Sequence, residues 1–199
     1  MTIFGKQFSR AWRSRCVVLL CLLAVAGDWL WFSRPVTASQ QLRGYAVSGV
    51  QVIDVVMPSG GPTQLHGIAT EDSEEIQELL GLLNQYPTNR KWDWSWLLGE
   101  GFGDYNGKDP YSSVWVVLSF RDADGKAGSL QYIVSETGRV QVFEPNRFGD
   151  VPAGVGRFGA EGAKQYFAAL HRFYEQKVDS PLWAPSTPTE EERSTGVDA

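Results

Sequence analysis

The chain has 199 residues, of which 43% are hydrophobic, 21% charged and 13% aromatic. This length allows one globular domain with appendages, and the 8 Trp, 7 Tyr and 10 Phe residues argue for a packed core rather than an intrinsically disordered chain. Residues 1–26 hold four cations and no acid, so 14 basic and 23 acidic groups, a net charge of −9, fall on the remainder. A domain this acidic lacks the positive surface that binds phosphate backbones, which argues against nucleic acid as a partner.

The first 32 residues have the pattern of an export signal. A cytoplasmic cationic region over 1–15 precedes an apolar stretch over 16–32, and the positive flank predicts that the rest of the chain lies outside the membrane. Two alternatives stay open. The stretch can persist as a single-pass anchor, since 17 helical residues cover about 25 Å of a roughly 30 Å hydrocarbon core. Otherwise it is cleaved after Ala26, where Ala24-Val25-Ala26 matches the small-residue pattern of a signal-peptide cleavage site, and the protein is secreted.

The cysteines restrict the chemistry of the exported part. Cys16 and Cys21 both lie in the apolar stretch, and the sequence has no other cysteine. The exported part therefore has no disulfide, no thiolate metal site and no cysteine nucleophile. Its stability must come from an apolar core, for which about 130 residues suffice.

Composition divides the exported part into three segments. A polar stretch that contains Pro35 predicts a linker over 33–45. We expect an α+β domain over 46–178. The segment over 179–199 is rich in Pro, Ser, Thr and Glu and lacks periodicity, which predicts a disordered acidic tail.

The domain opens with a predicted β-hairpin. Residues 50–56 are dense in β-branched side chains, as is typical of a strand, and the Gly- and Pro-rich residues 58–62 then turn the chain. Residues 64–68 can return as the second strand.

A helix follows the hairpin. Thr70, Asp72 or Ser73 can cap it, and Asp72 and Glu75 have the spacing of a capping box. Acidic residues fill the first turn, where the helix dipole favours anions. Apolar residues then recur at helical spacing, and Pro87 ends the pattern. The predicted buried stripe consists of Ile76, Leu79, Leu80 and Leu83.

Residues 86–112 fit no regular element, and three strands and a second helix are predicted after them. The strands cover 114–120, 129–134 and 139–143, and their short turns predict an antiparallel meander. A Gly-, Arg- and Phe-rich loop over 146–159 leads to a helix over 160–177. Its predicted buried stripe is Ala163, Tyr166, Phe167, Leu170 and Tyr174, with Phe173 beside it.

The element order is therefore β-β-α-β-β-β-α. It predicts an α+β fold in which two helices cover one face of an antiparallel sheet, preceded by the N-terminal hydrophobic helix. The other face of such a sheet is either solvated or bound to a partner.

Three features together indicate a family resemblance. The first strand ends in a Gly-Gly turn, and the run Gly67-Ile-Ala-Thr-Glu-Asp-Ser-Glu-Glu-Ile-Gln-Glu-Leu-Leu-Gly-Leu-Leu-Asn84 leads into the helix. A Gly- and Tyr-rich loop and a meander follow. Over residues 46–177 the chain resembles small extracytoplasmic domains of Gram-positive bacteria. The resemblance implies an N-terminal signal or anchor and no catalytic residues.

Two acidic clusters raise the question of calcium. An EF-hand loop beginning at Asp122 would need an oxygen ligand, Gly and a carboxylate where the chain has Lys126, Ala127 and Ile133, so we interpret 122–125 as a hairpin turn. The oxygen-rich residues 104–109 match no calcium motif. We expect a solvated loop there, with calcium binding as the alternative.

The histidines show no motif. His66 and His171 are the only two in the chain, and neither belongs to a sequence pattern that couples it to a catalytic Ser or Asp. We expect a surface or half-buried structural role for His171, no metal site and no cofactor.

The aromatic segment is the candidate binding surface. Three alternatives stay open for these aromatic rings. Buried rings would fill the core, whereas exposed Trp and Tyr rings would stack on sugars or anchor protein contacts outside the cell, or would contact the membrane surface. The candidate residues are Trp92, Trp94, Trp96, Phe102, Tyr105 and Tyr111.

The sequence thus favours a non-enzymatic extracytoplasmic domain that binds or scaffolds at the cell envelope. Expected partners are the membrane, through the N-terminal helix, and an envelope protein or polysaccharide. The alternative is a hydrolase of cell-wall polysaccharide that uses two carboxylates among Glu100, Asp104 and Asp109.

Overall fold

The computed structural model describes residues 10–58, 63–90, 111–121, 124–143, 151–155 and 159–186. The chain separates into two compact units, Met1–Arg34 and Pro35–Ala199.

The first unit contains helix α1 (Arg10–Phe32). Its large apolar side chains are exposed to solvent, among them Val17, Leu20, Leu23 and Leu30. Among the described residues, no helix is long and apolar enough to cross a membrane. The hydrophobic membrane helix expected over 16–32 is therefore unsupported by the structure, and export stays a prediction.

An antiparallel sheet dominates the second unit. The described strands follow the order β3-β7-β6-β5-β4-β1-β2-β8, eight strands in all, and every neighbouring pair is antiparallel. The α+β class, the β1–β2 hairpin and the β4–β5–β6 meander are confirmed. The strands are β1 (Val47–Met57), β2 (Gln64–Thr70), β3 (Thr88–Arg90), β4 (Tyr111–Arg121), β5 (Ala127–Ser135), β6 (Val140–Phe143), β7 (Val151–Val155) and β8 (Ala184–Ser186).

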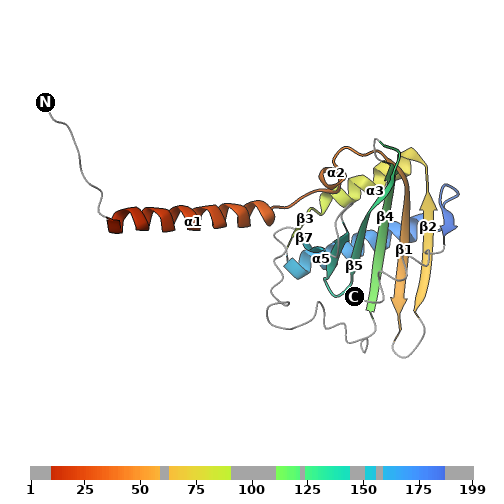
Figure 1. The fold of residues 1–199 in the computed structure, drawn as a ribbon. Coiled ribbons are helices and arrows are strands. Elements are labelled where there is room, and N and C mark those ends of the chain that lie inside the picture. The colour runs from red at the N-terminus through yellow and green to blue at the C-terminus, as the bar shows by residue number, and fades with distance from the viewer. Residues whose placement is uncertain are drawn as a thin grey trace. The chain divides into compact units, whose positions relative to one another are not determined.

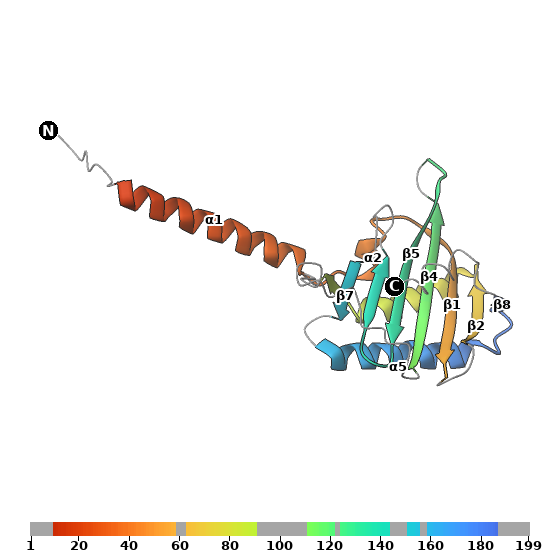
Figure 2. The same ribbon diagram turned by 60° about the horizontal axis from the view of Figure 1, so that its bottom comes forward.

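The described helices of this unit pack on one face of the sheet (Figures 1 and 2), and they are α2 (Ala38–Gln41), α3 (Ser73–Gln85) and α5 (Gly159–Lys177). Strand residues that alternate toward this face, such as Val52 and Val116, form one core with the helices. Every residue predicted for the two apolar stripes belongs to this core or packs against it. The predicted arrangement of two covering helices is confirmed, with the short α2 added.

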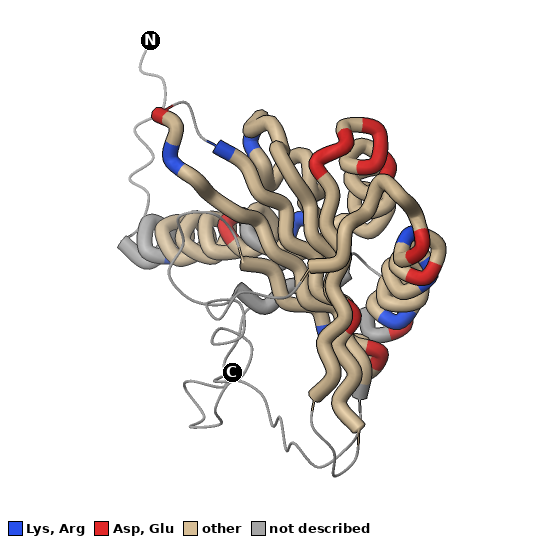
Figure 3. The backbone as a smooth tube through the Cα atoms, turned by 90° about the vertical axis from the view of Figure 1, so that its right-hand side faces the viewer, with Lys and Arg blue, Asp and Glu red and all other residues tan. Residues whose placement is uncertain are grey.

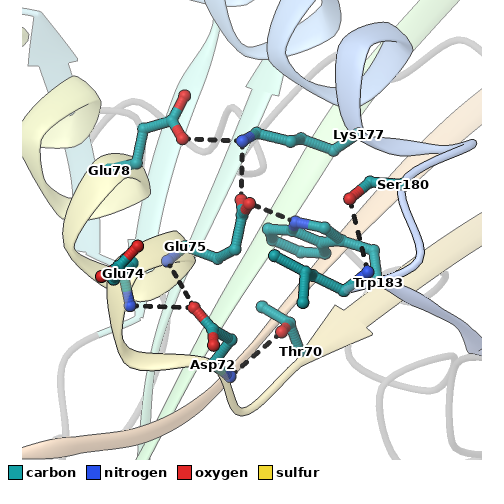
Figure 4. A network of polar contacts seen from close by, with 9 residues as sticks. Thr70, Asp72, Glu74, Glu75, Glu78, Lys177, Ser180 and Trp183 are labelled. Carbon is teal, nitrogen blue, oxygen red and sulfur yellow. Dashed lines mark hydrogen bonds and ion pairs between the residues drawn. The ribbon is translucent and has the colours of Figure 1, made fainter.

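Of the two hydrogen bonds that make up the predicted capping box of α3, the structure forms only the one that Asp72 accepts. Asp72 caps the helix as expected, because its side chain accepts hydrogen bonds from the backbone N–H groups of Glu74 and Glu75. The backbone N–H of Asp72, however, donates to Thr70 Oγ1. The Glu75 carboxylate instead contacts Lys177 and Trp183 (Figure 4), so the capping box predicted from spacing is incomplete.

The predicted linker over 33–45 requires correction. Residues 38–41 form α2, and Leu42 is buried in the core. Gln41 explains the docking, because it accepts a hydrogen bond from the Tyr132 hydroxyl and donates one to Thr88 Oγ1 at 3.0 Å. This segment thus joins the domain through the apolar side chains of Ala38 and Leu42 together with buried polar contacts.

The predicted tail over 179–199 requires correction in its first eight residues, while 187–199 lie outside the described residues. Residues 184–186 form β8, which pairs with β2, and Trp183 is buried against Phe173. Strands β3 and β7 also lie in segments for which no strand was predicted. All three strands are five residues or shorter, too short for an alternation of apolar and polar residues to stand out.

On its other face the sheet carries apolar, amide and hydroxyl side chains, and because none of the described helices packs there, we call it the helix-free face. Ile53, Val55 and Trp115 form a second, smaller buried cluster on it. Gln51 and Gln131 lie on the same face, one on each side of β4 in the register. Figure 3 shows the charged residues mainly on the helices and near the strand ends, with few over the body of the sheet.

Candidate functional site

Most of the predicted binding surface lies outside the described residues. Trp92, Trp94, Trp96, Phe102 and Tyr105 belong to residues 91–110, which also contain the carboxylates of the alternative hydrolase and the possible calcium cluster. Tyr111 is the first residue of β4, and its Cα pairs with that of Met57. The aromatic surface therefore stays a prediction.

The predicted turn after β4 is confirmed. Strands β4 and β5 pair as a hairpin up to Arg121 and Ala127, and Gly125 has the positive φ that a tight turn requires. Arg121 Nη1 donates to the carbonyl oxygen of Gly125 at 3.3 Å.

Both histidines meet at one aspartate, Asp54 of β1. Asp54 pairs directly with His66 of β2 and, on its other side, with Val114 of β4. His171 reaches it from α5, with 3.8 Å between His171 Nε2 and Asp54 Oδ1. Helix α5 packs across the helical face of the sheet (Figure 2), and the cluster therefore combines residues of β1, β2 and α5. We call Asp54, His66, His171 and Glu175 the Asp54 cluster.

Asp54 is a buried acceptor without a donor on one oxygen. The residue is 8% exposed, and Oδ1 has no hydrogen-bond partner. The 3.8 Å separation from His171 is too long for a hydrogen bond, although it suits an ion pair if the imidazole carries a proton. The buried Asp54 carboxylate has therefore lost hydrogen bonds to water that protein donors do not fully replace.

His171 lies between two carboxylates. Its Nδ1 is 3.6 Å from Glu175 Oε1, one helical turn further along α5, while its Nε2 faces Asp54. The Phe167 ring lies one turn earlier, 5.7 Å from the imidazole between ring centroids. The imidazole side chain is about one-third exposed, so protons can exchange with solvent.

Burial is the main cause that raises the pKa of Asp54 above its ordinary value of 3.8. His171 and His66 act in the opposite direction, and the charge of Glu175 adds to the rise. Burial also raises the pKa of the nearby Tyr174 hydroxyl, and the negative charge of Asp54 contributes to that effect. The cluster therefore favours states that hold a proton close to Asp54.

The chemistry that this arrangement supports is proton binding. Within the part of the chain that the structure describes, no group of three or more His, Cys, Asp or Glu side chains is arranged to hold a metal ion. A buried carboxylate with two imidazoles beside it can hold a proton and exchange it with these neighbours.

The sequence contained one usable signal for this cluster. Asp54 has the same strand parity as Val50 and Val52, which marks it as a core-facing carboxylate in an otherwise apolar strand. Counting residues back from the turn also pairs it with His66. Its contact with His171 depends on where α5 crosses the sheet, which no local pattern encodes.

A second polar network joins α3, α5 and the C-terminal segment. Lys177 Nζ lies 2.7 Å from Glu75 Oε2 and 2.7 Å from Glu78 Oε2, and Trp183 Nε1 donates to Glu75 Oε2 at 2.9 Å (Figure 4). The hydrogen bond from Lys177 lowers the pKa of Glu75, although burial opposes this. We call Glu75, Lys177 and Trp183 the Glu75 network, and its role is structural because each buried polar group finds a partner.

Comparisons with known proteins found no relative. The chain matches no protein-family model, and it matches neither a curated protein nor a solved structure.

Proposed function

We propose that this protein is a non-enzymatic domain of the cell envelope, exported by its N-terminal segment, that binds an envelope protein or polysaccharide. The observation that carries the proposal is the one-sided sheet. Helices pack on one face, whereas the opposite face combines amide and hydroxyl side chains with the apolar cluster around Trp115. Broad, uncharged faces of this composition suit partners that offer hydroxyl and amide groups.

The N-terminal segment supports the export part of the proposal. Four cations and no acid precede or lie within the start of α1, and the apolar side chains that follow are exposed. Water-exposed apolar surface of this extent calls for a covering phase or partner. Both forms of the proposal stand: a retained anchor, or a signal that is cleaved after Ala26.

A topology reporter tests export. An enzyme that is active only in the cytosol is fused after Ala199 of the full chain, and no activity is expected in intact cells. The same fusion without residues 1–32 is the control and should be active. Activity of the full-length fusion would contradict export, and the mature N-terminus, Met1 or Gly27, separates the anchored from the secreted form.

Binding is tested by co-sedimentation of the detergent-solubilised full chain with isolated cell-wall polysaccharide and with envelope membranes. Gln131→Lys puts a charge on the helix-free face and should weaken retention about tenfold, the equivalent of 1.4 kcal/mol. Gln165→Lys makes the same change at an exposed position of α5 and should have no effect. Equal retention of both variants would contradict binding through the helix-free face.

The aromatic segment belongs to the same proposal. Trp92, Trp94 and Trp96 are proposed to add stacking contacts to the bound partner. Their combined replacement by Ala should lower retention while leaving the helix content of the protein unchanged. Unchanged retention would remove the segment from the binding surface.

A further inference from the structure

The Asp54 cluster links three elements through groups that titrate. Asp54 lies on β1, His66 on its hairpin partner β2, and His171 and Glu175 on the C-terminal half of α5. The fourth element at this level, β4, contributes the apolar Val114. Tyr174, on the same half of α5, is close enough for the charge of Asp54 to affect its hydroxyl. The proton content of these groups therefore sets the electrostatic part of the contact between α5 and the hairpin, beside the apolar packing of α5 on the sheet.

We propose that the Asp54 cluster is a proton-operated clasp, in which uptake of a proton fastens the C-terminal half of α5 to the β1–β2 hairpin and its loss loosens this contact. The proposal is independent of export and of the partner that the domain binds.

The geometry explains why one proton is sufficient. Without it, Asp54 Oδ1 is a buried acceptor that no donor reaches. A protonated imidazole has an N–H on both ring nitrogens, and the two nitrogens of His171 already face Asp54 and Glu175 at 3.8 and 3.6 Å. Small side-chain movements would convert both contacts into charge-assisted hydrogen bonds. A proton on Asp54 itself would instead remove the buried charge.

The pKa of Asp54 agrees in direction with this assignment. Burial raises it, so the folded protein holds a proton at the cluster more readily than the unfolded chain does. A proton on either Asp54 or His171 relieves the unpaired buried charge of Asp54, so both protonation states belong to the closed clasp.

Amide hydrogen exchange of the full chain at pH 5 and pH 8, corrected for intrinsic exchange and with a chelator present, tests the clasp. Amides of residues 171–177 should be about tenfold more protected at pH 5 than at pH 8, because the protonated cluster opens less often. Amides of α3 provide the internal reference and should change less. This pH range lies above the ordinary pKa of Glu75, 4.5, so the Glu75 network keeps its charge.

Three variants make the test specific. Asp54→Asn removes the titrating acceptor and should make protection of 171–177 independent of pH. His171→Gln should remove most of the pH dependence, and Asp179→Asn, the same change at an exposed site after α5, should retain it. A pH response in Asp54→Asn equal to that of the unaltered protein would overturn the proposal.

Metal binding is the competing explanation. Zinc added without chelator at pH 8 should leave protection of 171–177 unchanged if the cluster binds protons. A strong zinc-dependent rise that Asp54→Asn abolishes would overturn the clasp in favour of a metal site.

Discussion

Glu75 on α3 and Asp54 on β1 are two carboxylates buried to almost the same degree, 9% and 8% exposed. Glu75 receives hydrogen bonds from Lys177 and from the Trp183 indole, both within 3 Å. Asp54 has two imidazoles nearby, but one of its oxygens has no donor. A hydrogen bond from Lys177 lowers the pKa of the first carboxylate, whereas burial raises that of the second.

The difference shows that donors, rather than depth, decide whether a buried carboxylate stabilises a fold. The pKa of Lys177 is raised as well: burial alone would lower it, but the hydrogen bonds to Glu75 and Glu78 outweigh burial. The ion pair between Glu75 and Lys177 therefore stabilises the fold at neutral pH. The Asp54 cluster has the properties of a switch, because its most stable state contains one more proton.

The largest expected effect comes from removing the indole of the Glu75 network. Trp183→Ala should lower the free energy of unfolding by about 3–5 kcal/mol, because it leaves a cavity beside Phe173 and removes one donor to Glu75. Denaturant unfolding measures the change. Leu182→Ala, at the exposed neighbouring position, should cost less than about 0.5 kcal/mol. Similar costs for both variants would show that the segment after α5 is not part of the core.

The charge of Glu75 should have the next largest effect. Glu75→Gln keeps the size of the side chain and removes the charge that faces Lys177, at an expected cost of about 2 kcal/mol at pH 7. Glu78→Gln removes the other carboxylate bound to the same ammonium group, but Glu78 is 56% exposed, so its cost should stay below about 0.5 kcal/mol.

The stability difference between the unaltered protein and Glu75→Gln should depend on pH, because the pKa of Glu75 is lowered in the folded protein. The stabilisation is present above the ordinary value of 4.5 and is lost as the pH falls through the lower folded-state pKa. Unfolding of the protein and of Glu75→Gln, measured from pH 7 down to pH 3, should therefore converge at the acidic end. Parallel curves would contradict the assignment of the pKa shift to this network.

The smallest expected effect has the opposite sign. Asp54→Asn should raise the free energy of unfolding by about 1 kcal/mol at pH 8, since it removes a buried charge that lacks a donor. Because the pKa of Asp54 is raised in the folded protein, Asp54 destabilises the fold least below pH 3.8. Its destabilising effect grows as the pH rises through the folded-state pKa. The advantage of the variant should thus shrink toward pH 4. Thermal unfolding across this range checks the prediction, and an advantage that grows on acidification would contradict it.

Local patterns predicted most of the second unit. The α3 stripe from Ile76 to Leu83, the β1–β2 hairpin and the meander followed from residue spacing and turn chemistry, because each depends on residues close in sequence. Prediction failed where short segments dock through distant contacts. Gln41 joins the core through Thr88 and Tyr132, and β8 is positioned by Trp183.

The sequence by itself determined the fold class, the cysteine-free body and the amphipathic helices, because composition and periodicity are properties of the chain alone. Only the tertiary structure decided which polar groups meet. Trp183 finds Glu75 across 108 positions of sequence, and both histidines converge on Asp54, because sheet order and the path of α5 set these neighbours. The free energy of a buried charge depends on the donors that surround it, and those donors come from elements that no local pattern connects.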